Sequence, residues 1–312
     1  MRTAQRPLRM SPLAQKLAVA VGQSLRGKED AIELAIVTLV AGGHLLIEDH
    51  PGVGKTLLAK SLAKALDLQF QRVQCTADLL PSDILGAQIY HPRTGELTFR
   101  PGPVFTSVLL ADELNRTPPR TQSALLECMA ERAVTIDRQT HSLPDPFFVI
   151  ATQNPLTAAG TYPLPENQLD RFLMSIKLGY LDAEHEIEVV AREDGHRFVD
   201  ELRPVATREE LLRARAAVDA VRCDRELAAF MVELAHRTRR NSDAVLGVST
   251  RGAQALHRAC RARAWVSGRD FVVPDDVRAL LLPVWVHRIT ARSGGDAEAL
   301  LHEILADTPL PD

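Results

Sequence analysis

The segment from residue 44 to residue 66 constrains the fold of this chain more than any other part of the sequence. An apolar run at 44–48 is followed by His50-Pro51-Gly52-Val53-Gly54-Lys55-Thr56, and then by a helical pattern that reaches Leu66. Glycines between a strand and a helix allow backbone N–H groups to approach phosphate oxygens, and Gly-Lys-Thr at the start of the helix is typical of a phosphate-binding loop. The sequence therefore predicts a strand, a loop and a helix that together bind the phosphates of a nucleotide.

Two side chains of this loop have predicted roles in ATP binding. Lys55 is expected to place its charge on the β- and γ-phosphate oxygens, and the Thr56 hydroxyl is expected to bind Mg²⁺. Asp49 stands where the general pattern has its first glycine, and we expect the turn to tolerate it because Asp adopts left-handed backbone more readily than most residues. The predicted nucleotide-binding residues of the loop are Asp49, His50, Pro51, Gly52, Val53, Gly54, Lys55, Thr56 and Leu57.

Polar residues also follow two further apolar runs. The run at 108–111 ends in Asp112 and Glu113, and the run at 147–150 leads to Asn154. Asp112 is expected to bind nucleotide and to hold Mg²⁺ through its waters, while Glu113 polarises the water that attacks the γ-phosphate. Asn154 is expected to hydrogen-bond that water or the γ-phosphate, although Asn-Pro also starts turns. Glu113 and Asn154 are therefore candidate catalytic residues, and Thr56 and Asp112 are candidate metal ligands.

The alternation of apolar runs and helical patterns predicts an α/β domain at residues 11–180. Five strands are expected, at 44–48, 70–74, 108–111, 147–150 and 174–178, and the continuous apolar runs are typical of a parallel sheet covered by helices on both faces. Polar segments at 89–99 and 134–143 predict two hairpins, which could also be mere surface decoration.

Helical patterns dominate after residue 180. They predict a second, all-helical domain at 181–312, with a hinge at Gly179–Asp182. Residues 1–10 are basic and contain proline, and we expect a disordered tail there.

Composition narrows the class of protein. A net charge of −3 argues against a globally basic nucleic-acid binder. The four cysteines form no Cys-x-x-Cys pair, so we expect reduced thiols and no transition-metal site. The most apolar stretch, 31–47, is interrupted and too short for a membrane span, and the N-terminal apolar run is shorter than that of a signal peptide. We therefore expect a cytoplasmic protein.

The order of these motifs resembles the MoxR family of AAA+ ATPases. The resemblance rests on residues 52–56, 111–127, 151–155 and 160–172, and it extends from about residue 20 to residue 290. The segments 111–127 and 160–172 are specific to that family. Arg26-Gly27-Lys28 departs from its Val-Gly-Gln-like adenine contact. The resemblance implies an AAA+ P-loop NTPase core, with a parallel sheet flanked by helices, and a C-terminal all-helical lid.

The resemblance also assigns two arginines to catalysis. Arg171 matches the residue that reaches the γ-phosphate of a neighbouring subunit, which implies a homo-oligomer, most simply a hexameric ring. Arg116 and Arg120 are rival candidates, and a surface ion pair between Asp170 and Arg171 is the alternative. Arg251 resembles the sensor-2 arginine, which contacts phosphate and couples the lid to the nucleotide.

The activity that follows from the resemblance is hydrolysis of ATP to ADP and phosphate at subunit interfaces, with ATP and Mg²⁺ as cofactors. It would drive the remodelling, assembly or activation of a client protein complex, together with a partner that carries a von Willebrand factor A domain.

A motor subunit of a metal-chelatase or gas-vesicle system shares every motif and stays an alternative, as does a scaffold that binds ATP without useful turnover. A DNA-acting motor is a further alternative because of Arg258, Arg261, Arg263 and Arg269, but acidic residues elsewhere in the second domain offset their charge.

Overall fold

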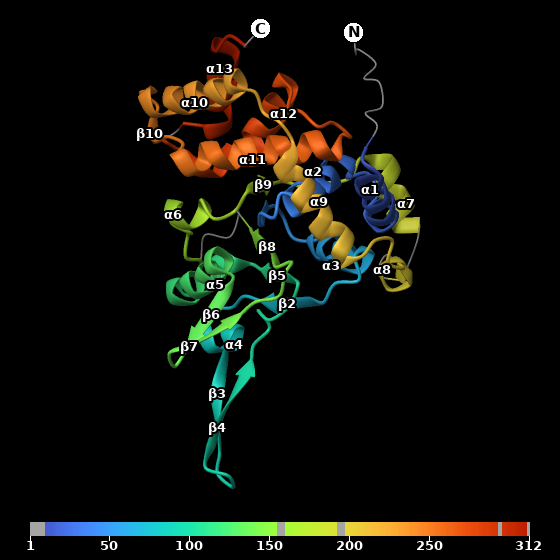
Figure 1. Cartoon of the computed structure of the whole chain (residues 1–312), viewed down its shortest axis with the longest axis vertical. Coiled ribbons are helices and arrows are strands. Elements are labelled where there is room, and N and C mark those ends of the chain that lie inside the picture. Colours follow the sequence, from blue (N-terminus) through green and yellow to red (C-terminus); the bar gives the residue numbers. More distant parts are fainter. Residues whose placement is uncertain (1–9, 155–159, 192–196, 293–294, 311–312) are drawn as a thin grey trace.

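The central feature of the computed structural model is a five-stranded parallel sheet that lies below a layer of helices (Figure 1). The structure describes residues 10–154, 160–191, 197–292 and 295–310. Residues 1–9 of the predicted N-terminal tail lie outside these ranges. The strands, in the spatial order β2-β5-β8-β1-β9, are Phe70–Gln74, Val108–Asp112, Phe148–Gln153, Leu45–Glu48 and Met174–Ile176. All five predicted strands therefore form this sheet.

Successive side chains of the strands enter two different cores. Leu45 and Ile47 pack on one face with the helices α1 (Pro12–Ser24), α2 (Glu29–Val40) and α3 (Lys55–Ala65). Leu46 packs on the other face with α4 (Pro81–Leu85) and α5 (Pro119–Glu131). Burial on both faces explains why β5 and β8 are continuous apolar runs, whereas the edge strand β2 is largely polar and exposed. Because the strands are parallel, their carboxyl ends lie along one edge of the sheet.

Both predicted hairpins are present. Strands β3 (Gly86–His91) and β4 (Glu96–Pro101) pair antiparallel, as do β6 (Ala133–Ile136) and β7 (Gln139–Ser142). The β3–β4 hairpin projects far from the rest of the molecule (Figure 1). Tyr90 and Leu97 on this hairpin are 60% and 64% exposed, so it presents apolar side chains to its surroundings.

The C-terminal part is helical apart from one small sheet. Its helices include α9 (Arg208–Ala220), α10 (Arg225–Arg240), α11 (Thr250–Val266), α12 (Pro274–Trp285) and α13 (Ala297–Asp307). A capping box starts α9, because Thr207 and Glu210 exchange side-chain and backbone hydrogen bonds. Strands β10 (Ala244–Leu246) and β11 (Thr290–Ala291) pair antiparallel, which the sequence did not predict. Short elements complete the chain: η1 (Leu114–Arg116), α6 (Glu166–Leu169), α7 (Ala183–Ala191), α8 (Arg197–Glu201) and η2 (Val286–Arg288).

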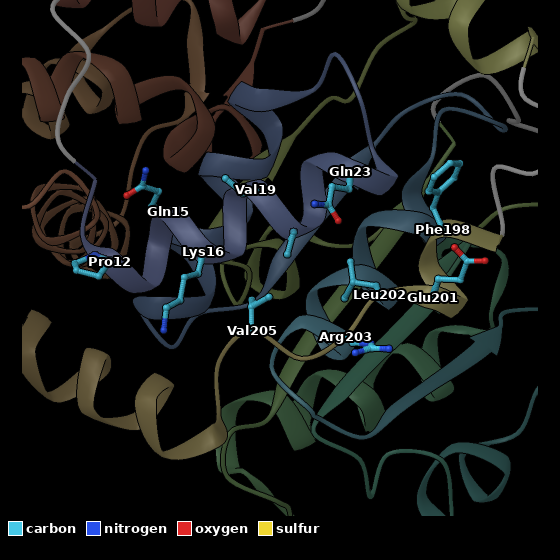
Figure 2. A pocket seen from close by; sticks show the side chains of 11 residues that line it. Pro12, Gln15, Lys16, Val19, Gln23, Phe198, Glu201, Leu202, Arg203 and Val205 are labelled. Atoms are coloured by element: carbon cyan, nitrogen blue, oxygen red, sulfur yellow. The ribbon is translucent and has the colours of Figure 1, made fainter.

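The segment around α8 lies against the sheet domain, although the predicted boundary assigns it to the second domain. The backbone N–H groups of Val205 and Ala206 donate to the Ala65 carbonyl at the end of α3. Phe198 and Leu202 line a hollow of about 760 Å³ together with residues of α1, and Figure 2 shows the side chains from both segments around it. The domain division at residue 180 therefore stays a prediction.

Candidate functional site

The loop between β1 and α3 has the backbone geometry of an anion-binding turn. Gly52 has φ +85° and Gly54, which precedes the first residue of α3, has φ +101°. A Cβ at Gly54 would lie 2.6 Å from Leu25 Cδ1, so position 54 accepts no larger residue without a shift. The first backbone N–H groups of α3 have no partner within the helix, and the helix dipole favours an anion there.

Asp49 has a structural role that the sequence did not predict. It is absent from the positive-φ residues of the described chain, so the expected left-handed backbone is wrong. One carboxylate oxygen accepts hydrogen bonds from the N–H groups of Leu178 and Gly179, both at 2.6 Å, and the other accepts from His50 N–H at 2.8 Å. The carboxylate therefore ties the loop to the segment after β9, and the assignment of Asp49 to the nucleotide contacts stays a prediction.

Lys55 points into a cleft of about 530 Å³ at the carboxyl edge of the sheet. Its Nζ donates to the Asp49 carbonyl at 2.5 Å. Partial burial lowers the pKa of Lys55, and the charges of Asp112, Asp49 and Glu113 oppose this shift. We call this cavity the Lys55 cleft, and its lining consists of Pro51, Gly52, Gly54, Lys55, Thr56, Leu57, Arg72, Gln74, Asp112, Glu113, Asn154 and Val189.

Asp112 and Glu113 lie at the end of β5 and are held by neighbouring strands. The Thr152 hydroxyl, on β8, donates to Asp112 Oδ1 at 2.6 Å and accepts from Glu113 N–H at 2.8 Å. Arg72, on the edge strand β2, pairs with Asp112 Oδ2 at 2.7 Å. Glu113 has φ +59°, a left-handed backbone that costs roughly 1–2 kcal/mol for a residue with a Cβ. The surrounding contacts therefore fix Glu113 in a strained backbone at the cleft.

The Glu113 carboxylate has hydrogen-bond partners within its own chain. Its Oε2 accepts hydrogen bonds from Gln74 Nε2 and from Arg116 Nη1, both at 3.0 Å. Arg116 is thus the partner of the carboxylate in its own chain, and Arg120 lies exposed in the first turn of α5. In this arrangement each carboxylate at the end of β5 faces an arginine, and a reaction at Glu113 requires these contacts to change.

The donor set of the cleft fits a magnesium ion. Thr56 and Asp112 both line it, and hydroxyl and carboxylate oxygens are hard ligands that Mg²⁺ prefers, with water and phosphate oxygens filling its other positions. The role of an ion at this place would be to neutralise phosphate charge.

A smaller, apolar pocket of about 160 Å³ adjoins the cleft at Gly52, Gly54, Leu57 and Val189. Leu25, Val53 and Leu181 are among its lining residues. The ion pair between Arg26 Nη1 and Glu188 Oε2 at 2.6 Å joins the α1 end to α7 beside it.

Of the predicted loop residues, 51–57 line the cleft, the apolar pocket or both, whereas His50 stacks on Tyr180 at a ring-centroid distance of 5.6 Å. The two spaces together suit a triphosphate and a flat base.

Arg171 and Arg251 lie elsewhere. Neither lines the Lys55 cleft, and both line a second cavity of about 340 Å³. Arg171 Nη1 donates to the Leu126 carbonyl at 2.5 Å, while its buried Nε has no hydrogen-bond partner among the residues that the structure describes. Ser249 caps α11, where its hydroxyl accepts from Gly252 N–H at 3.0 Å, and this places Arg251 in the first turn. The chain therefore brings Glu113 and Asn154 to Lys55 but keeps the two arginines apart from them.

The alternative of a surface ion pair between Asp170 and Arg171 is wrong. Asp170 Oδ1 pairs with Arg288 Nε at 2.8 Å, and Arg288 is only 5% exposed. Arg288 also donates to the Phe172 carbonyl at 2.5 Å and to the Leu173 carbonyl at 3.2 Å. Because Arg288 belongs to the C-terminal part, this pair ties that part to the segment that carries Arg171.

Known proteins match this chain over both of its parts. The model of the ATPase family associated with various cellular activities (AAA) matches residues 44–174, and the model of the AAA lid domain matches residues 236–304. Chaperone MoxR1 of Mycobacterium tuberculosis is 36% identical over 91% of this chain and 77% of its own length. The chain belongs to the MoxR family of AAA+ ATPases.

Two further similarities agree with membership of the MoxR family. The uncharacterized protein YeaC of Bacillus subtilis is 42% identical over 97% of this chain and 96% of its own length. A crystal structure from Cytophaga hutchinsonii, assigned as an ATPase, superposes with a TM-score of 0.88 at 37% identity and covers 96% of both chains. The predicted fold class, an AAA+ core with a helical lid, is thus confirmed. Among the described residues, no helix is both long and apolar enough to cross a membrane.

Three residues of this MoxR-family cleft were missed by the sequence reasoning. Arg72 and Gln74 both reach the carboxylates from β2, and Thr152 bridges them from β8. Part of the role of Arg72 and Gln74 was visible in the sequence. Their strand was predicted directly after the helix that follows the phosphate loop, and residues two apart on a strand share a face. What the sequence could not supply is the pairing of β2 with β5, which sets Gln74 opposite Asp112.

Proposed function

We propose that this chain hydrolyses ATP with Mg²⁺ in the Lys55 cleft, completed by arginines of a second copy of the chain. The observation that carries the proposal is the distribution of the side chains. Lys55, Thr56, Asp112, Glu113 and Asn154 share one cleft, as the hydrolysis of a phosphoanhydride requires. Membership of the AAA+ ATPase family supports the same activity.

Within one chain, binding and water activation have separate residues. Lys55 and the N-terminus of α3 bind the β- and γ-phosphates, and Thr56 and Asp112 hold the ion, which neutralises phosphate charge. Glu113 accepts a proton from the attacking water once it has left Arg116 and Gln74. Asn154 orients that water or the γ-phosphate. The adjoining pocket, with Leu25 and its apolar neighbours, takes the base.

Arg171 and Arg251 act on the ATP of a neighbouring copy. Both lie outside the cleft of their own chain, and the buried Nε of Arg171 has no partner in the described part of the chain, so an anion could supply one. An arginine supplied in trans stabilises the charge of the transition state. The active unit is accordingly a homo-oligomer, and a hexameric ring is the form that we propose.

Hydrolysis drives a conformational change in a client protein. The client contact that we propose is the projecting β3–β4 hairpin, since Tyr90 and Leu97 are exposed there. A partner with a von Willebrand factor A domain would work with the ring in the cytoplasm.

Replacing Tyr90 and Leu97 with Ser should abolish capture of a client while ATP turnover is retained. Retained capture would exclude the hairpin, and a captured metal-chelatase or gas-vesicle assembly would identify those alternatives.

The catalytic proposal is tested by Glu113→Gln. This change keeps the size of the side chain and its hydrogen bonds but removes the base, so steady-state ATP turnover should fall roughly 10²- to 10⁴-fold. Binding of a fluorescent ATP analogue should remain, because Lys55 and the loop are unchanged. A matched control is Glu298→Gln on the surface of α13, which should leave turnover unchanged. Equal turnover in wild type and Glu113→Gln would contradict the assignment.

A further inference from the structure

The second cavity has an unusual charge. It lies where α11, the end of α5 and the turn at residues 42–44 meet, and it has a volume of about 340 Å³. We call it the arginine cavity, because its charged lining consists of Arg132, Arg171, Arg251, Arg258, Arg288 and a single carboxylate, Asp170. His44 also lines it, but burial lowers the pKa of His44 to about 4, so this ring adds no charge at neutral pH.

The one carboxylate that lines the arginine cavity already has an ion-pair partner. Asp170 pairs with Arg288 at 2.8 Å, and the other four arginines have no ion-pair partner within 4.0 Å among the described residues. The cavity thus keeps several uncompensated guanidinium groups in one place. Charges of like sign that line one cavity repel each other, and a bound anion would reduce that cost.

Arg258 lies close to two other cations. Partial burial lowers the pKa of Arg258, and the charge of Arg132 lowers it further, against an opposing effect of Asp219. Burial lowers the pKa of Arg215 to about 10; its ion-pair partner Asp145 opposes this shift, and the charges of Arg132 and Arg258 add to it. The fold therefore holds these arginines together against their mutual repulsion.

The backbone beside Arg258 is adapted to this crowding. Arg258 Nη2 lies 3.4 Å from the Gly42 carbonyl oxygen, and a Cβ at Gly42 would lie 2.9 Å from the same nitrogen. Gly42 also has φ +64°, which L side chains rarely adopt. A residue with a side chain at position 42 would force the Arg258 guanidinium to shift.

Arg258 and Arg251 are on one face of α11. They are seven residues apart, which is two helical turns and a rise of about 10 Å. Gln254 and Ala255, at intermediate positions on this face, line the cavity as well. The face that carries the sensor-2-like arginine thus continues into a second arginine, and both present guanidinium donors to the same space.

We propose that the arginine cavity binds a phosphate group, with Arg132 and Arg258 as ligands in addition to Arg171 and Arg251. Guanidinium groups bind phosphate oxygens in a bidentate manner, and the unpartnered Nε of Arg171 supplies a further buried donor. The volume corresponds to about ten water molecules, which suits a small anion or the end of a nucleotide and not a protein segment. For Arg171 and Arg251 this inference rests on the proposed function, whereas Arg132 and Arg258 are assigned from the cavity alone.

The phosphate has two sources that share this chemistry. It is either the γ-phosphate of ATP bound by a neighbouring copy or free inorganic phosphate. The two are separable because the first requires two copies and a nucleotide, whereas the second requires neither.

The first experiment uses the full chain with Lys55→Ala, so that the Lys55 cleft cannot bind phosphates well. Thermal unfolding is followed while inorganic phosphate is titrated at constant ionic strength. Phosphate should raise the melting temperature, and adding Arg132→Gln and Arg258→Gln should weaken the apparent affinity roughly tenfold for each arginine. Adding Arg278→Gln instead, an exposed arginine of α12, removes the same charge and should leave the affinity unchanged. An equal loss with Arg278→Gln would overturn the proposal.

The second experiment distinguishes the sources. Chains with Arg132→Gln and Arg258→Gln are mixed with Lys55→Ala chains, so that an intact Lys55 cleft can meet an intact arginine cavity on another copy. Recovery of ATP turnover upon mixing supports the γ-phosphate of a neighbour as the ligand. Phosphate binding without such recovery supports free phosphate. If phosphate does not stabilise Lys55→Ala and the double arginine variant keeps the wild-type kcat and KM, the proposal is overturned.

Two further measurements distinguish a wrong phosphate-binding proposal from a misfolded variant and from failure of the proposed function. Arg258→Lys keeps the charge but loses the bidentate geometry, so it should fold normally and show an intermediate phosphate affinity. If Glu113→Gln turns over ATP as fast as wild type while phosphate still binds to the arginine cavity, the catalytic proposal fails and this inference stands.

Discussion

The two charged cavities of this chain differ in how completely the charges of their lining residues are balanced. In the Lys55 cleft, both carboxylates at the end of β5 are paired with arginines, Asp112 with Arg72 and Glu113 with Arg116. In the arginine cavity, one carboxylate faces five guanidinium groups. The cleft supplies the loop and the acids, and the cavity supplies the cations that such a reaction needs. The formal charges of the residues that line the cleft cancel, whereas those that line the cavity leave an excess of cations, which is the expected pattern if two copies of the chain meet to form one site.

The largest expected effect is that of Arg171→Ala. If the arginine cavity completes the cleft of a neighbour, turnover should fall roughly 10³- to 10⁵-fold, because stabilisation of the transition-state charge is lost. Binding of ATP, measured by fluorescence of a labelled analogue, should weaken much less. Arg120→Ala, an exposed residue of α5, serves as the rival variant. A larger loss of turnover in Arg120→Ala than in Arg171→Ala would transfer the role to Arg120.

Arg288→Ala should show that one arginine of the cavity serves stability and not the ligand. Arg288 is 5% exposed and is paired with Asp170, so its removal leaves a largely buried carboxylate without its partner. We expect a loss of about 3–5 kcal/mol in the free energy of unfolding, measured with urea. Arg258→Gln, which breaks no ion pair, should cost far less than Arg288→Ala. Similar losses in both variants would contradict the distinction between paired and unpaired arginines.

His44 makes the stability of the cavity region sensitive to acid. Its Nδ1 accepts from Val149 N–H at 3.0 Å, so the ring is neutral, and burial lowers its pKa from 6.5 to about 4. Below pH 6.5 His44 binds a proton in the unfolded chain but stays neutral in the folded chain. The contribution of His44 to stability is therefore full above pH 6.5 and is lost as the pH falls towards 4. The expected loss is up to about 3 kcal/mol.

His44→Asn should remove this part of the pH dependence in urea unfolding between pH 7.5 and pH 4.5. The remaining slope would include His287, whose pKa burial also lowers. An unchanged slope in His44→Asn would show that His44 is not the responsible group.

The smallest expected effect concerns the other cavity. Arg72 occupies Asp112 Oδ2, an oxygen that Mg²⁺ would use through its waters, and the Arg72 side chain is 47% exposed. Arg72→Ala should therefore lower the Mg²⁺ concentration needed for half-maximal turnover by about two- to fivefold, the range of a solvent-exposed ion pair. Arg93→Ala at the tip of the β3–β4 hairpin is a suitable control. A higher Mg²⁺ requirement in Arg72→Ala would contradict competition and favour a direct role of Arg72 in binding.

The parts of the site that could be predicted are those that short segments determine. The loop at 50–57 and the strand ends at Asp112, Glu113 and Asn154 follow from local patterns, since carboxyl ends of parallel strands meet at one edge. The α/β domain followed from the alternation of strands and helices, whereas the AAA+ core with a helical lid followed from the family resemblance, and this fold class was confirmed.

Contacts between distant segments could not be predicted. The hydrogen bonds of Asp49 could not be predicted because its partners, Leu178 and Gly179, lie about 130 residues away and no local pattern indicates them. Likewise, Arg132 and Arg258 come together only through the packing of α11 on the sheet domain. The strands β10 and β11 are too short for a periodicity to be visible in the sequence.

The central claim is that a single reaction site is built from two copies of the chain. Its most direct test is to mix the inactive variants Glu113→Gln and Arg171→Ala in varied ratios and to measure steady-state ATP turnover. Some sites in a mixed oligomer would combine the intact cleft of an Arg171→Ala chain with the intact arginine cavity of a Glu113→Gln chain. Turnover that rises well above that of either variant alone, with a maximum at intermediate ratios, is the predicted result. Turnover that never exceeds the weighted sum of the two variants would contradict a shared site.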